Sequence, residues 1–252
     1  MRHGAFLTAT GSSQRTETTR RACDPAARVR VENDAGLIEM SAWENYEIEV
    51  VAHKHAPDEA SLDLLDVEVD VAPEGILVSY TSPEPIPDAW VDFVVRCPRM
   101  AALDIHNASC EILVSGFHAQ SRAATSSGTI RAARMRGTAT LTSASGAIDG
   151  AALEGTVYAR TASGRVNLHG HMTGSHRVET ASGDITVEGV QGSIDARSVS
   201  GSIAVEGQLA ESCLLRTVSG NITVVLLPGS GLAAGAVRAE TTSGRVDVSE
   251  AH

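Results

Sequence analysis

The fold is decided by the stretch Ser182-Gly183-Asp184-Ile185-Thr186-Val187. It is one of seven copies of the pattern Ser-Gly-x-(Ile/Val), where x is any residue. The glycines of these copies, called marker glycines below, are Gly128, Gly146, Gly164, Gly183, Gly201, Gly220 and Gly244. They lie 18, 18, 19, 18, 19 and 24 positions apart. A near-constant period of this length predicts stacked short units, or rungs.

Each unit is built from columns of fixed chemistry. The column two positions after the marker glycine is Ile130, Ile148, Val166, Ile185, Ile203, Ile222 and Val246. The column five positions before it is Ala123, Leu141, Ala159, Val178, Ala196, Leu215 and Ala239. Alternation of such apolar positions with polar ones is typical of half-buried strands. Each unit is therefore predicted to hold two short strands and two turns, with the marker glycine at one corner and Gly170, Gly189 and Gly207 at the second.

A third column carries only hydroxyl side chains, three positions before the marker glycine. Its members are Thr125, Ser143, Thr161, Thr180, Ser198, Thr217 and Thr241. Their parity matches that of the inward positions, and buried polar groups usually serve hydrogen bonding. We therefore predict a hydroxyl ladder that satisfies backbone groups at the corner, not a row of nucleophiles.

The repeats resemble the bacterial "putative adhesin" family, a β-solenoid domain of unknown function related to autotransporter-adhesin head modules. The resemblance rests on the repeated Ser-Gly-x-Ile/Val-x-Val pattern and on the stretches leading into it, 91–98, 103–109 and 29–38. It covers roughly residues 27–250. One departure is Cys110, which stands where the first rung should have its glycine. The resemblance implies a non-catalytic surface for binding at the cell envelope.

The fold prediction is an all-β chain with a single β-solenoid of about eight rungs. Residues 1–26 are predicted to be a flexible tail, 27–108 a β-strand region that continues or caps the sheet faces, and 109–252 the repeat solenoid. Within the middle region we expect strands at Tyr46–Ala52, Val67–Val71, Ile76–Tyr80 and Val91–Arg96, and a helical turn at Asp58–Leu65. The insertion 226–232 is expected to cover the open end.

Composition limits the partners. The chain has 252 residues, a net charge of −11 and 3% aromatic residues. Residues 1–126 carry 20 Asp and Glu against 10 Lys and Arg, so the acidity lies in the first half. Nucleic acids need clustered cations, so binding to them is not expected. No stretch approaches the roughly 20 apolar residues that span a bilayer, so direct membrane insertion is not expected either.

No motif indicates catalysis or a cofactor. The chain lacks a G-x-S-x-G elbow, a P-loop and H-E-x-x-H, and its repeated serines have no histidine column beside them. The four cysteines, Cys23, Cys97, Cys110 and Cys213, form no C-x-x-C, which argues against a zinc site. The sequence leaves open whether Cys97 and Cys110 pair. We expect no enzyme activity, no catalytic residue, no cofactor and no metal.

One surface column is a weak candidate for ligand binding. Five positions after the marker glycine, three consecutive units place His169, Glu188 and Glu206. Stacked rungs would hold their side chains about 5 Å apart, close enough to share a ligand. His176 lies at an inward parity and is expected to be a core-edge histidine.

Three functions are compatible with the sequence. The favoured one is a non-catalytic solenoid that presents an extended surface to a protein or glycan, with self-association through the solenoid edges as a further partner interaction. The alternatives are a carbohydrate-active enzyme of the polysaccharide lyase or hydrolase kind, which would use Glu188 and Glu206, and a cytoplasmic partner-binding regulatory module. The lack of a signal or anchor points to the cytoplasm and the resemblance to the envelope, so the compartment stays open.

Overall fold

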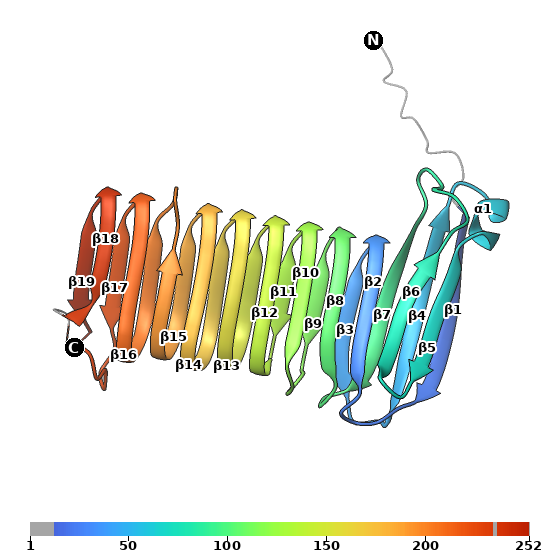
Figure 1. The fold of residues 1–252 in the computed structure, drawn as a ribbon, viewed down its shortest axis with the longest axis horizontal. Coiled ribbons are helices and arrows are strands. Elements are labelled where there is room, and N and C mark those ends of the chain that lie inside the picture. Colours follow the sequence, from blue (N-terminus) through green and yellow to red (C-terminus); the bar gives the residue numbers. More distant parts are fainter. Residues whose placement is uncertain (1–12, 234–235, 252) are drawn as a thin grey trace, which may run out of the picture.

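The computed structural model describes residues 13–233 and 236–251, which form an elongated all-β body with one short helix (Figure 1). All 19 strands of these residues belong to one continuous sheet. From β8 to β19 the strands run parallel to their neighbours, and the chain winds forward one repeat at a time, whereas the pairs β1–β4, β4–β7 and β5–β6 are antiparallel. This is the solenoid-like architecture that the repeats predict.

Two faces of parallel strands enclose the core. The first face consists of β2 (Arg28–Ala35), β8 (Ala102–Ser109), β10 (Ser121–Ser127), β12 (Arg136–Ser145) and β18 (Arg238–Ser243). The second consists of β3 (Ile38–Trp43), β9 (Ile112–Ser115), β11 (Ile130–Ala133), β17 (Ile222–Leu226) and β19 (Val246–Glu250). Four long strands contribute to both faces: β13 (Ile148–Ser163), β14 (Val166–Ser182), β15 (Ile185–Arg197) and β16 (Ile203–Ser219).

The repeat columns lie in register, and the two apolar columns form the core. Ile185 of β15 pairs with Val166 of β14 and with Ile203 of β16, and all three side chains are at most 1% exposed. The marker glycine turns the chain from the first face to the second. A Cβ on Gly183 would lie 2.1 Å from the carbonyl oxygen of Gly164, so the rungs approach each other too closely for a side chain.

The second corner differs from its prediction. The sequence suggested a turn at Gly170, Gly189 and Gly207, yet β14, β15 and β16 run through these residues without a break. The ladder only shifts register there, for example between Glu188 and Val190. A β-bulge bends a strand while most of its hydrogen bonds stay intact, so the glycines mark a bulged bend and not a turn.

The N-terminal strands extend both faces. They are β4 (Glu47–Ala56), β5 (Asp66–Ala72), β6 (Gly75–Thr81) and β7 (Trp90–Pro98), close to the four predicted segments. β7 continues the second face beside β3, and β6 continues the first face beside β2. The helix α1 (Glu59–Asp63) begins after Asp58, whose side chain accepts a hydrogen bond from the Ser61 backbone N–H. The predicted helical turn is therefore confirmed.

The predicted flexible tail, residues 1–26, is wrong for Ser13–Ala22. These residues form β1, which pairs antiparallel with β4 along its whole length. Residues 1–12 lie outside the described residues. β1 was missed because its inward-facing side chains are charged: Glu17 pairs with the buried Lys54 at 2.5 Å, and Arg15 pairs with Asp63 of α1 at 2.6 Å. Partners from other elements satisfy these charges, which a pattern of hydrophobicity does not reveal.

At the other end, the insertion does not cover the last strands. Leu226 is the end of β17, and the backbone N–H groups of Leu227 and Leu232 donate to carbonyls of β16. The insertion thus packs on the preceding rung, and Val246 of β19 is 41% exposed. Among the described helices, none is long and apolar enough to cross a membrane.

Candidate functional site

The hydroxyl column forms a ladder along the marker corner. From Ser143 onward, each hydroxyl donates to the carbonyl oxygen of the marker glycine one rung earlier. The bonds are Ser143 to Gly128 (3.2 Å), Thr161 to Gly146 (3.0 Å), Thr180 to Gly164 (3.1 Å), Ser198 to Gly183 (3.1 Å), Thr217 to Gly201 (2.9 Å) and Thr241 to Gly220 (3.0 Å). The hydroxyls therefore satisfy corner backbone groups, as predicted, and are not free to act as nucleophiles.

The ladder changes at its first rungs. Asn107 takes the hydroxyl position there and donates to the Gly36 carbonyl at 2.9 Å. Thr125 follows, and its Oγ1 is buried without a hydrogen-bond partner in the described structure. The preceding corner residue is Cys110, the residue that replaces the marker glycine and has φ +108°. The irregular corner and the orphan hydroxyl thus lie in neighbouring rungs.

Replacing Thr161 by valine should lower the free energy of unfolding by about 1 kcal/mol, because the shape is kept while one hydrogen bond is lost. The same change at Thr125 removes no bond and should alter it by less than about 0.5 kcal/mol. Urea denaturation of the two variants measures the difference. Equal losses would contradict a ladder that stabilises rung by rung.

The predicted ligand column is present as a row on the surface. His169 pairs in register with Glu188, and Glu188 with Glu206, so consecutive rungs hold the three residues side by side. All three are exposed. Among the residues that the structure describes, no group of three or more His, Cys, Asp or Glu could hold a metal ion. The row's role in ligand binding stays a prediction.

His176 is a satisfied core histidine. It is 3% exposed, its Nδ1 accepts a hydrogen bond from the Val157 backbone N–H at 3.2 Å, and its Nε2 lies 3.0 Å from the Met172 carbonyl oxygen. These partners require a neutral ring with the proton on Nε2. Burial lowers the pKa of His176 from its ordinary value of 6.5, although the Met172 carbonyl opposes this shift.

Acidification should therefore destabilise the protein through His176. Because the folded-state pKa is lowered, the unfolded chain binds the proton more readily, and the free energy of unfolding falls once pH drops below about 6.5. The loss grows until pH passes the folded-state pKa. His176→Gln, which cannot titrate, should show a shallower decrease between pH 7 and pH 5 in urea denaturation. An unchanged slope would contradict the neutral buried ring.

The cysteines are unpaired. All four are free, with Cys97 buried and Cys110 exposed. Burial raises the pKa of the Cys213 thiol to about 12, and burial also raises the pKa of Cys97 strongly. Cys213 thus occupies a core position, where it is 2% exposed.

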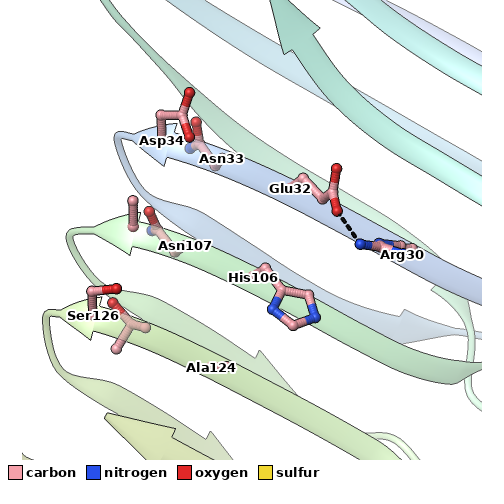
Figure 2. Close-up of a pocket in the computed structure, with 10 residues that line it drawn as sticks. Arg30, Glu32, Asn33, Asp34, His106, Asn107, Ala124 and Ser126 are labelled. Atoms are coloured by element: carbon pink, nitrogen blue, oxygen red, sulfur yellow. Dashed lines mark ion pairs between the residues drawn. The ribbon is translucent and has the colours of Figure 1, made fainter. Parts of the chain in front are cut away.

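A shallow hollow on the first face was not predicted. Its volume is about 500 Å³, and Arg30, Glu32, Asp34, His106 and Ser126 are among its lining residues (Figure 2). The strands β2, β8 and β10 bring these residues together although β2 and β8 are far apart in sequence. The small side chains of Ala108 and Ala124 leave the hollow open. No repeat pattern marks these positions, because their chemistry changes from rung to rung.

Residues 154–252 match the model of the family described as Toastrack DUF4097. The last part of the chain is thus similar to the Toastrack family. The match begins within β13 and ends at the last residue, so the matched part contains the marker glycines from Gly164 to Gly244. The adhesin-type resemblance inferred from the repeats is thereby confirmed for a family of unknown function.

Solved structures of bacterial proteins are similar to this chain at low sequence identity. A "putative adhesin" from Bacteroides fragilis is 10% identical with a TM-score of 0.45, over 95% of this chain and 98% of that one. A "putative lipid binding protein" from Parabacteroides distasonis is 10% identical with a TM-score of 0.41, over 94% and 97%. A "putative adhesin" from Parabacteroides merdae is 14% identical with a TM-score of 0.32, over 94% and 96%. None of the curated proteins matches this chain.

Proposed function

We propose that this chain is a non-catalytic β-solenoid of about eight rungs that presents an extended surface for binding or scaffolding at the cell envelope. One observation carries the proposal: the inward columns repeat, while an outward column of the first face varies. The outward column four positions before the marker glycine reads Ala124, Thr142, Arg160, Glu179, Arg197, Arg216 and Glu240. A repeat whose core is constant and whose surface varies is suited to recognition.

The varied column is largely occupied by surface ion pairs. Glu179 lies 3.8 Å from Arg160 and also pairs with Arg177, and Arg216 pairs with Glu240 at 3.1 Å. Such exposed ion pairs add little to the free energy of unfolding. Their role in the proposal is to present charged groups to a binding partner. We propose that the repeat part, 109–252, supplies this surface and that the part 27–108 closes the other end of the same body.

Fractionation of native cells tests the proposal, with protease added to intact cells and the protein followed by blotting. We expect the protein in the envelope fraction and cleaved by external protease. Protein found only in the cytosol and protected from protease would overturn the envelope function and favour the regulatory module.

The enzyme alternative has a separate test at the row of His169, Glu188 and Glu206. Purified protein incubated with a panel of polysaccharides should release no reducing or unsaturated ends. Cleavage that is lost in both Glu188→Gln and Glu206→Gln, with folding intact, would overturn the non-catalytic proposal.

A further inference from the structure

A row of serines runs along the marker corner, immediately before the marker glycines. We call it the serine ridge, and it consists of Ser109, Ser127, Ser145, Ser163, Ser182, Ser200, Ser219 and Ser243. Each serine pairs in register with the next along the row. Neighbouring strands are about 4.8 Å apart, so the ridge is a straight row of hydroxyls with that repeat.

The ridge hydroxyls have no structural task. From Ser127 to Ser243 the side chains are exposed, and none of these seven hydroxyls has a hydrogen-bond partner in the described part of the chain. Ser109 alone donates, to the Asp34 carbonyl at 3.0 Å. The hydroxyl column two positions earlier is used by the ladder from Ser143 onward and contains both Ser and Thr. The ridge keeps serine in every copy although its hydrogen-bonding groups remain open.

The ridge leads into the hollow of the first face, where buried polar atoms also lack partners. Thr125, 6% exposed, and Asn33, 5% exposed, line the hollow, and their Oγ1 and Oδ1 atoms are unpaired among the described residues. Asp34 and Ser126 lie at the corner end of the hollow (Figure 2). An unpaired buried polar group costs free energy that a hydrogen-bonding ligand or a water recovers.

The surface chemistry limits the partner. Ridge carbonyls already accept hydrogen bonds from the preceding rung, as in Gly146 N–H to Ser163 O at 2.8 Å, so an extended peptide cannot pair with this backbone. The ridge and the exposed column beside it, which includes Ala144, Ala162, Ala181, Val199 and Val218, carry no charge. The outward column that flanks them holds both signs, as in Arg160, Glu179 and Arg197, so a phosphate backbone finds no continuous line of cations here.

We propose that the serine ridge and the hollow at its end bind a linear, uncharged polysaccharide. Sugar hydroxyls can both donate to and accept from serine hydroxyls, and the neighbouring methyl groups can contact the apolar faces of the sugar rings. Each contact is weak, and a chain that spans several rungs sums them. The inference rests on the proposed binding function and names the class of ligand for it.

Electrophoresis of the full chain through gels that contain mixed-linkage β-glucan, xylan or mannan tests the proposal, with polygalacturonate as the charged counterpart. The ridge variant replaces Ser145, Ser163, Ser182 and Ser200 by alanine. The control variant replaces four outward hydroxyl residues of the second face, Ser41, Ser115, Thr186 and Thr223, by alanine. A third variant, Ala124→Trp, fills the hollow.

We expect at least one neutral polysaccharide to retard the wild type and the control variant, also at high salt. The ridge variant should bind at least roughly tenfold more weakly than the wild type. Ala124→Trp should also bind more weakly. The melting temperature of the ridge variant should stay within about 2 °C of the wild type, since no internal hydrogen bond is lost.

Three results would each overturn the inference. They are a wild type that no neutral polysaccharide retards, a ridge variant that is retarded as strongly as the wild type, and a ridge variant with a lowered melting temperature. Unchanged retardation of Ala124→Trp would overturn the role of the hollow. The result of the cell fractionation does not depend on any of these outcomes. The envelope function and the class of ligand can therefore be refuted independently.

Discussion

Replacing Gly183 by alanine should lower the free energy of unfolding by about 3 kcal/mol or more. The new Cβ would lie 2.1 Å from the Gly164 carbonyl oxygen and 2.6 Å from its carbonyl carbon. Both rungs are held by backbone hydrogen bonds, Gly164 N–H to Ser182 O and Gly183 N–H to Ser200 O, so neither can move away without losing pairs. The φ of +150° at Gly183 adds strain for any residue with a side chain.

Ser182→Ala is the matched control for this prediction. It changes the adjacent residue of the same corner, whose side chain is exposed and whose hydroxyl makes no internal bond, so the free energy of unfolding should change by less than about 0.5 kcal/mol. Urea denaturation followed by circular dichroism measures both variants. A loss at Gly183 no larger than that at Ser182 would show that the corner relaxes and that the repeated glycine has another cause.

The repeat part was predictable because each rung buries the same positions. The column of Ile185, the hydroxyl ladder and the marker corner follow from a period and an alternation that seven copies display together. The second corner was harder, since Gly189 suits both a turn and a bulge, and only the pairing of β15 with its neighbours distinguishes them.

The N-terminal part was less predictable because its strands have no repeat. β4, β5, β6 and β7 were recognised from alternating β-branched residues, whereas β1 presents charged side chains inward. Glu49 of β4 illustrates the reason: it is 4% exposed and pairs with Arg20 of β1 and Arg96 of β7. A buried carboxylate of this kind is compatible with folding only once both arginines are in place.

The candidate ligand residues also divide into those that the repeat predicts and those that only the folded sheet reveals. The row of His169, Glu188 and Glu206 was found because its members stand at one position of the repeat. The hollow was missed because Asp34 and His106 belong to strands that are neighbours only in the folded sheet. Sequence periodicity finds surfaces that run along the solenoid, while a local depression depends on which side chains happen to be small.

Val166→Asp and Val246→Asp should differ strongly although both change the same column of the repeat. Val166 is fully buried between Ile148 and Ile185 of the neighbouring strands, so an aspartate there places an unpaired charge in the core. We expect a loss of about 4 kcal/mol or more in the free energy of unfolding. Val246 is 41% exposed and pairs with Ile222 on one side, so the same change should cost less than about 1 kcal/mol.

Thermal and urea unfolding of the two variants measure this contrast. Equal losses would mean that the last rung is as well covered as the middle ones, which would contradict the open end formed by β18 and β19. A large loss at Val166 alone would show that a residue's contribution depends on having a rung on both sides. Because each rung contacts only its neighbours, the free energy of unfolding is then determined by how the rungs stack on one another. Outward positions such as the serine ridge can consequently change without loss of the fold.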